Sequence, residues 1–182
     1  MTTNLGKFIE IVTKRSIENT SSIMILHNHE NYGTCISLLR QELDSLIRVC
    51  YLNTLSDNLE ITRLINNTIN GIEWEKNGKR IFERKMVNIA SHFNSWATDV
   101  YDFGNSFTHL TNFHDYKNND PLRNIDVAKK ATIKQYLKSY HQFPESLEIT
   151  FENIIPYIPK VAEKVSNNLN VYIGNLENRF ND

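Results

Sequence analysis

Hydrophobic residues recur along most of this chain at the three- and four-residue spacing of an amphipathic helix. The clearest case lies within residues 31–55, where the apolar positions are Ile36, Leu39, Leu43, Leu46, Ile47, Cys50 and Tyr51. The same period predicts further helices over about 4–27, 56–69, 79–102, 124–142 and from Pro159 towards the C-terminus. We therefore expect an all-α protein, a single-domain antiparallel helical bundle of about six helices over residues 1–182.

Residues 70–80 fit two local structures. Asn77-Gly78 is a favourable two-residue hairpin turn, and Trp74 alternates with the polar residues Glu73 and Glu75, as in a strand. An isolated hairpin is only marginally stable in water, so a loop is the favoured interpretation. The hairpin stays open as the alternative.

Composition and charge narrow the class of protein. The chain has 20 basic and 21 acidic residues and a formal net charge of −1, so no global field attracts it to nucleic acid or membrane. No stretch approaches the ~20 apolar residues that a membrane span requires. The first residues have neither the basic start nor the apolar core of a secretion signal. We expect a cytoplasmic protein with no membrane partner.

The cysteines and histidines give no sign of a disulfide or a metal site. Cys35 and Cys50 lie on one predicted helix, about 22 Å apart at 1.5 Å per residue, whereas a disulfide requires Cα atoms within about 7 Å. They are predicted to be free thiols in a reducing compartment. The histidines lack the spacing of a structural zinc site, and there is no glycine-rich phosphate loop. The sequence therefore predicts no metal and no cofactor.

Arg40 is the first residue that could carry chemistry. At about 100° per residue it falls inside the apolar stripe of its helix, and Asp44 falls at the edge of that stripe. A buried arginine needs a partner. Asp44, one turn away, is the local candidate, and the region of Tyr101 to His109 is the other. A structural ion pair inside the bundle is the favoured interpretation. A catalytic or ligand-binding role is the alternative, because such pairs also shape active sites.

A second group of polar residues is spaced four residues apart. Tyr101, Asn105 and His109 stack along one side of a helix if that helix continues through Gly104, and cluster at a corner if Gly104 breaks it. Either arrangement lets the hydroxyl and the amide hold the imidazole of His109 in one tautomer. A capped helix junction with a structural histidine is the favoured interpretation. The alternative is a functional His109 beside a pocket or a dimer groove, within reach of Arg40.

Three lysines lie one turn apart on the helix predicted over 124–142. Lys130, Lys134 and Lys138 have Tyr136 and Tyr140 nearby, and lysines interleaved with aromatic rings can follow a phosphate backbone. A solvated helix face is the plainer interpretation of the same pattern.

Two segments resemble a known group of proteins. SLLRQELDSLIRVCYL (37–52) and YDFGNSFTHLT (101–111) are similar to motifs of uncharacterised bacterial helical proteins, which read S-L-L-R-x-x-x-E and Y-x-x-x-S-x-x-x-H-x-S. Arg40, Tyr101 and His109 match these motifs, whereas Asp44 stands in place of glutamate, and Asn105 and Thr111 in place of serines. The group resembles the HEPN superfamily of toxin–antitoxin and phage-defence systems. The resemblance implies a HEPN-like bundle, commonly a homodimer.

One feature of HEPN ribonucleases is missing. Their arginine is followed by four to six residues and a histidine on one helix, whereas the nearest pair here, Arg84 and His92, has seven residues between them. We therefore expect a non-catalytic helical binding module, dimeric and with an RNA or protein partner, in a bacterial stress or defence system. The alternative is a metal-independent endoribonuclease with His109 as general acid and base and Arg40 stabilising the phosphorane charge.

Overall fold

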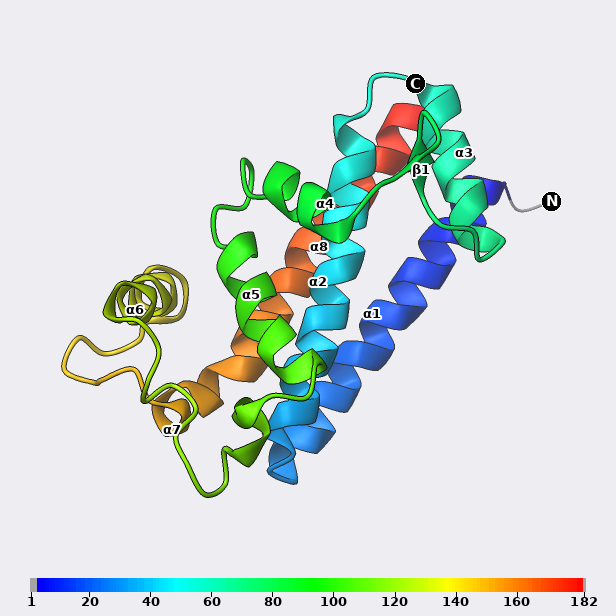
Figure 1. Ribbon diagram of the computed structural model, residues 1–182. Helices are drawn as coiled ribbons and strands as arrows, with labels where there is room; N and C mark the ends of the chain where they lie inside the picture. Colours follow the sequence, from blue (N-terminus) through cyan, green and yellow to red (C-terminus); the bar gives the residue numbers. More distant parts are fainter. Residues whose placement is uncertain (1–2, 182) are drawn as a thin grey trace.

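The computed structural model describes residues 3–181 of the chain, and helices make up most of this range (Figure 1). The elements in chain order are α1 (Asn4–Asn28), α2 (Tyr32–Thr54), α3 (Asn58–Ile69), β1 (Glu75–Lys76), β2 (Lys79–Arg80), α4 (Glu83–Ala90), α5 (Ala97–Thr108), a 3-10 turn (Asn112–Asp115), α6 (Val127–His141), α7 (Phe151–Ile154), a second 3-10 turn (Ile155–Tyr157) and α8 (Ile158–Asn181). The prediction of an all-α helical bundle is confirmed.

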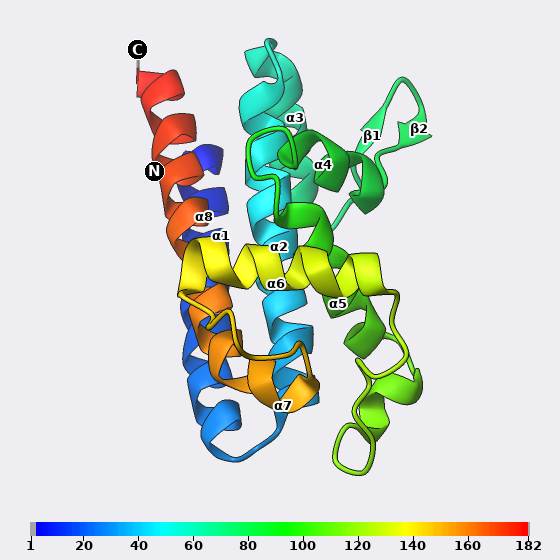
Figure 2. The same ribbon diagram turned by 90° about the vertical axis from the view of Figure 1, so that its left-hand side faces the viewer.

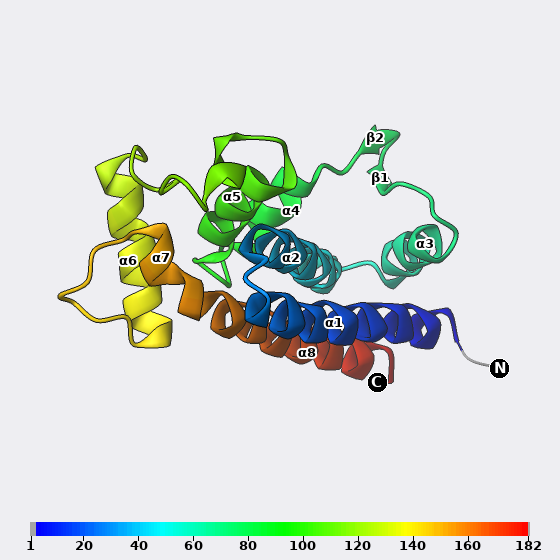
Figure 3. The ribbon, with the colours of Figure 1, turned by 90° about the horizontal axis from the view of Figure 1, so that it is seen from below.

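Helix α2 forms the centre of the bundle. Helices α1 and α8 lie on one side of it and α4 and α5 on the other (Figure 3). Helices α1 and α5 run antiparallel to α2, and α6 crosses the bundle on the outside (Figure 1; Figure 2). The apolar side chains of α2 are accordingly buried on several sides, including Ile36, Leu43, Leu46 and Leu52, each 0% exposed. Within residues 3–181 no helix is both long enough and apolar enough to span a membrane.

The segment predicted as one helix over 79–102 is a strand followed by two helices. Helix α4 ends at Ala90 and α5 begins at Ala97. Between them Asn94 is buried, and its side-chain amide donates to the Tyr172 hydroxyl on α8 at 3.0 Å. The run His92-Phe93-Asn94-Ser95 has low intrinsic helix propensity, so this tertiary contact decides the local structure. The single-helix prediction was wrong for that reason.

The hairpin alternative for residues 70–80 is the observed one. Strands β1 and β2 pair antiparallel, Glu75 with Arg80 and Lys76 with Lys79. Asn77 and Gly78 have φ values of 53° and 71°, the left-handed conformation that a tight primed hairpin turn requires. Trp74 supplies the missing stability, because its side chain is 3% exposed and its Nε1 donates to Thr68 Oγ1 on α3 at 2.9 Å.

The helix ends differ slightly from the expected ones. Asp57, not Ser56, caps α3, and its side chain accepts from the Leu59 amide at 2.8 Å. Asp126, not Asn124, caps α6 through the Ala128 amide at 2.7 Å. The two late prolines act as predicted, since the short helix α7 ends just before Pro156 and the long helix α8 begins next to Pro159.

Candidate functional site: an arginine cleft

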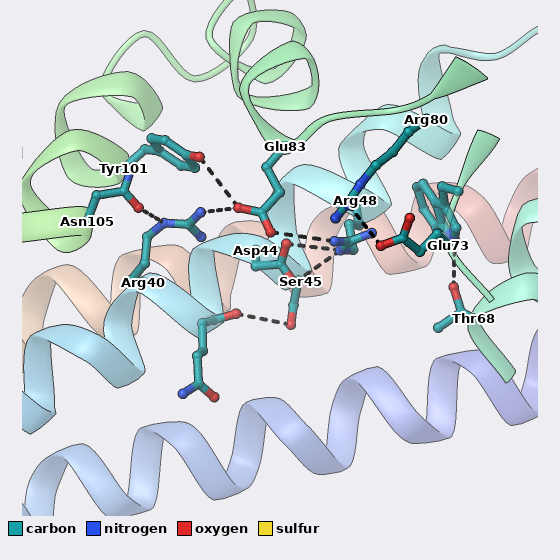
Figure 4. Close-up of polar contacts among 12 residues, drawn as sticks. Arg40, Asp44, Ser45, Arg48, Thr68, Glu73, Arg80, Glu83, Tyr101 and Asn105 are labelled. Atoms are coloured by element: carbon teal, nitrogen blue, oxygen red, sulfur yellow. Dashed lines mark hydrogen bonds and ion pairs between the residues drawn. The ribbon is translucent and has the colours of Figure 1, made fainter. Parts of the chain in front are cut away.

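Arg40 is buried on the side of α2 that faces α4 and α5. The residue is 6% exposed, its Nε donates to Asn105 Oδ1 at 2.9 Å and its Nη2 to Glu83 Oε2 at 2.5 Å. Its guanidinium carbon also lies 3.9 Å from the centroid of the Tyr101 ring (Figure 4). The prediction that Arg40 is buried with a partner in the Tyr101 region is confirmed. Its ionic partner is Glu83, however, and not Asp44.

Gly104 allows α5 to approach α2 at this point. Helix α5 runs through Gly104 without a break, which settles the two alternatives for Tyr101 and Asn105 in favour of a continuous helix. A Cβ atom on Gly104 would lie 2.8 Å from the Cβ of Arg40, closer than real Cβ atoms come. The glycine therefore packs directly against the stem of Arg40 and brings Tyr101 and Asn105 to its guanidinium.

Asp44 binds two other arginines. Its carboxylate accepts from Arg48 Nε at 2.9 and 3.0 Å and from Arg15 Nη1 on α1 at 3.2 Å. Helical side chains lean towards the N-terminus of their helix, so Arg48 reaches back over Asp44 while Arg40 leans away from it. The acid-before-base order at this spacing is also the favourable one.

Glu83 is a site residue that the sequence analysis missed. It is the first residue of α4, where the helix dipole favours a negative charge. Besides the bond from Arg40, its carboxylate lies 3.8 Å from Arg48 Nη2 and accepts from the Tyr101 hydroxyl at 3.4 Å (Figure 4). Glu83 therefore connects the buried Arg40 to the more exposed Arg48.

Beside this network lies an open cleft, which we name the arginine cleft. Its volume is about 530 Å³, and its lining includes the guanidinium-bearing residues Arg15, Arg48, Arg80 and Arg84 together with Glu83 and the aromatic residues Trp74, Phe82 and Tyr101. These residues come from α1, α2, the hairpin, α4 and α5. Elements far apart in the sequence thus supply one surface.

Several guanidinium groups of the cleft lie over aromatic rings. Arg48 lies 5.3 Å from the Trp74 ring and Arg84 4.8 Å from the Tyr101 ring, measured from the guanidinium carbon. Arg84 also donates to Asp102 Oδ1 at 2.6 Å, and this hydrogen bond raises the pKa of Arg84. Rings and ion pairs together hold the arginines in defined orientations.

The cleft and its floor carry a positive surplus. Within residues 3–181, the five guanidinium groups of Arg15, Arg40, Arg48, Arg80 and Arg84 pair with four carboxylates, those of Asp44, Glu73, Glu83 and Asp102. The chain as a whole has a net charge of −1. The positive charge of the cleft is therefore local and does not follow from the overall composition.

His109 does not join this site. It is the C-cap residue of α5 and is exposed, and its carbonyl oxygen lies 3.1 Å from His114 Nε2. The Tyr101 hydroxyl and the Asn105 amide oxygen, which were expected to hold the imidazole, bind Glu83 and Arg40 instead. Arg40 is buried and bonds Asn105 and Glu83, whereas His109 is exposed, and no hydrogen bond joins the two within residues 3–181.

The three lysines of α6 bind neighbouring segments of the chain. Lys134 Nζ donates to the Glu145 carbonyl at 2.6 Å, Lys138 pairs with the Glu145 carboxylate, and Lys130 Nζ donates to the Arg123 carbonyl at 3.3 Å. These bonds tie α6 to the loops before and after it. The structure therefore gives the lysines a structural role and places none of them at the arginine cleft.

Glu42 forms a second buried polar cluster on α2, and the sequence analysis did not single it out. The residue is 0% exposed, and its carboxylate accepts from Ser16 Oγ at 2.5 Å and from Asn19 Nδ2 at 3.0 Å, both on α1. Ser16 Oγ lies 2.9 Å from Ser166 Oγ on α8. The cluster joins three helices, and none of its residues lines the arginine cleft.

The cysteines are free, buried and unreactive by environment. Burial raises the pKa of the Cys35 and Cys50 thiols to about 11, so both are protonated at neutral pH. The described part of the chain contains no group of three or more His, Cys, Asp or Glu side chains that could hold a metal ion.

The chain was compared with protein-family models, curated proteins and solved structures. No match was found. The HEPN-like resemblance therefore stays a prediction from two short motifs. Assignment of the arginine cleft depends on its own geometry and charge.

Proposed function

We propose that this protein is a non-catalytic binding module whose ligand is a phosphate-bearing anion held in the arginine cleft. The observation that carries the proposal is the convergence of guanidinium groups from α1, α2, the hairpin and α4 on one open cleft of about 530 Å³. Guanidinium groups bind phosphate through planar, bidentate hydrogen bonds, and they tolerate partial desolvation better than ammonium groups.

The arginines keep free donors for such a ligand. A guanidinium has five N–H donors. Within residues 3–181, Arg48 donates only from Nε to Asp44, and Arg15 only from Nη1 to Asp44 and Ser45. Arg15 and Arg48 line the cleft together with Arg80 and Arg84, whose guanidinium groups supply further donors. A phosphate oxygen would find several of them within one cavity.

The lip of the cleft favours a ligand that also carries a flat group. Phe82 is 63% exposed although it lines the cleft, and the guanidinium carbon of Arg80 lies 5.6 Å from its ring. An exposed ring beside a cation stacks well on a planar group next to a phosphate. We therefore expect ADP to bind more tightly than pyrophosphate, and Phe82→Ala to weaken only ADP.

Calorimetric titration of the full chain with pyrophosphate at low salt tests the proposal. Arg48→Gln is expected to weaken binding at least tenfold while the protein stays folded, because Asp44 keeps its bond from Arg15. Arg63→Gln is the matched control, since Arg63 lies on α3 and donates to the Glu75 carbonyl outside the cleft lining. Absence of binding by the unaltered protein, or equal binding by Arg48→Gln, would contradict the proposal.

A homodimer remains part of the proposal, and we place its interface on the outer face of α1. Trp74 and Trp96 are 3% and 4% exposed in the single chain, so these rings are already buried without a partner. The exposed apolar side chains of α1 instead occupy an arc of about 140° on its outer face. They are Ile11, Ile17, Met24 and Ile25. Light scattering should give twice the 21.3 kDa chain mass, and Ile17→Glu should give 21.3 kDa.

No observation favours the ribonuclease alternative. It needs His109 and Arg40 at one reacting phosphate, whereas His109 is an exposed helix cap and no hydrogen bond joins it to Arg40 within residues 3–181. The setting in a bacterial stress or defence system, and an RNA or protein partner, stay predictions from the resemblance alone.

A further inference from the structure

Glu83 lies where an anion bound in the arginine cleft would make its strongest contacts. One carboxylate oxygen accepts from Arg40 Nη2 and the Tyr101 hydroxyl, and the other lies 3.8 Å from Arg48 Nη2 (Figure 4). A phosphate has oxygens with the same charge and acceptor chemistry as this carboxylate. The three donors thus already form a site for an oxyanion, and Glu83 fills it.

Glu83 also separates the cleft from the buried arginine. Glu83, Arg48 and Tyr101 line the cleft, whereas Arg40 does not. The side chain of Arg40 is 8% exposed and that of Glu83 is 43% exposed. A buried guanidinium is not left without a partner, so Glu83 can leave Arg40 only when another anion replaces it.

Of the two carboxylates between these arginines, Glu83 is the one that can move. The Asp44 side chain is 14% exposed and both its oxygens accept from guanidinium nitrogens. Glu83 is three times as exposed, and its helix α4 has 8 residues with the hairpin directly before it. Its carboxylate can therefore rotate towards solvent with little change in its hydration.

We infer that Glu83 is a built-in competitor: its carboxylate occupies the anion position of the ligand-free protein, and the phosphate group of the ligand displaces it to bind Arg40, Arg48 and Tyr101. This inference rests on the proposed function of the cleft. Glu83 then controls the affinity of the cleft for its ligand. Arg40 becomes a ligand contact that is accessible only once the ligand has displaced Glu83.

Pyrophosphate titration of Glu83→Gln tests the inference. The glutamine keeps the shape and an acceptor oxygen for Arg40 but loses the charge, so pyrophosphate should bind at least tenfold more tightly than to the unaltered chain. Glu73→Gln is the matched control. It removes one negative charge from the lining of the same cleft, where Glu73 pairs with the exposed Arg80 at 2.9 Å, and should change the affinity less than threefold.

The outcomes separate the inference from the proposed function. Binding by the unaltered protein, with equal or weaker binding by Glu83→Gln, overturns the inference and leaves the proposed function standing. An equal gain in Glu73→Gln and Glu83→Gln also overturns it, because a general charge effect then explains the result. No binding by any of the three proteins overturns both.

A second variant covers the case in which Glu83→Gln does not fold. Glu83→Asp keeps the charge beside Arg40 but shortens the reach of the carboxylate by one methylene, so it competes less well. Pyrophosphate should bind to it severalfold more tightly than to the unaltered chain. Equal or weaker binding would overturn the inference here as well.

Discussion

Two buried polar clusters on α2 differ in almost every respect that bears on function. Arg40 and Glu42 are two residues apart, so they point to opposite sides of the helix. Glu42 faces α1 and α8, is 0% exposed and accepts hydrogen bonds from a hydroxyl and an amide group. Arg40 faces α4 and α5 and binds a carboxylate whose side chain is 43% exposed.

The difference shows which cluster can act on a ligand. Both hydrogen bonds to Glu42 come from α1, and Ser16 in turn contacts Ser166 on α8, so the cluster fixes how these three helices pack. The Arg40 cluster continues through Glu83 into an open cleft with further arginines. A buried charge therefore indicates a site only when its network of partners reaches solvent.

The largest expected effect is on stability, at Glu42. Glu42→Ala opens a cavity between three helices and leaves the donors of Ser16 and Asn19 without their acceptor. We expect a loss of about 3 kcal/mol in the free energy of unfolding, measured by urea denaturation. Pyrophosphate binding should be unchanged at temperatures where the variant is folded.

Glu18→Ala is the control for that loss. Glu18 lies exposed on α1, so the same substitution there should change the free energy of unfolding by less than about 0.5 kcal/mol. If Glu42→Ala were as mild as its control, the cluster would not hold the three helices together. Glu42 could then no longer be contrasted with Arg40 as a purely structural cluster.

The next effect concerns the close packing of α5 on α2. Gly104→Ala places a Cβ 2.8 Å from that of Arg40, so the two helices must separate, at a cost of about 2 kcal/mol. Gly174→Ala is the matched control, because Gly174 on α8 has nothing within 4 Å of its added Cβ. That variant should gain up to about 1 kcal/mol from helix propensity. Equal thermal stability of both variants would show that Gly104 does not set the helix contact.

The two clusters should also differ in their dependence on salt concentration, although this effect is smaller. Exposed charges are screened as ionic strength rises, whereas a sealed cluster is not. Between 50 and 200 mM salt we expect the affinity of the cleft for pyrophosphate to fall about fivefold. The stability loss in Glu42→Ala should stay constant within error over the same range. Titration and urea denaturation at matched salt concentrations provide the measurement.

The sequence predicted the burial of Arg40 because its position on the helix wheel depends only on local geometry. It predicted the wrong partner because a helical wheel does not show the direction in which a side chain leans along the helix. Arg48, and not Arg40, reaches Asp44. Glu42 was overlooked for a related reason. Helix α2 is covered on several sides, so polar positions outside the apolar stripe are also buried.

The sequence analysis missed Glu83 for a different reason. Glu83 begins α4 because the hairpin precedes it, and the break after Ala90 separates α4 from α5. Both features depend on side-chain contacts with other helices. Trp74 anchors the hairpin to Thr68, and Asn94 binds Tyr172. Local periodicity cannot detect such contacts, so residues 79–102 resembled one helix.

The smallest expected effect is at the lysines of α6, and it tests whether positive charge alone makes a phosphate site. Lys130, Lys134 and Lys138 bind carbonyl or carboxylate oxygens of adjacent loops, and none lines the arginine cleft. Replacing all three by alanine removes three positive charges, two more than Arg48→Gln removes. We nevertheless expect the affinity for pyrophosphate to stay within twofold of the unaltered chain, measured by the same titration. A tenfold loss would place the anion site on α6, where the lysines were first considered, and would remove the arginine cleft from the comparison.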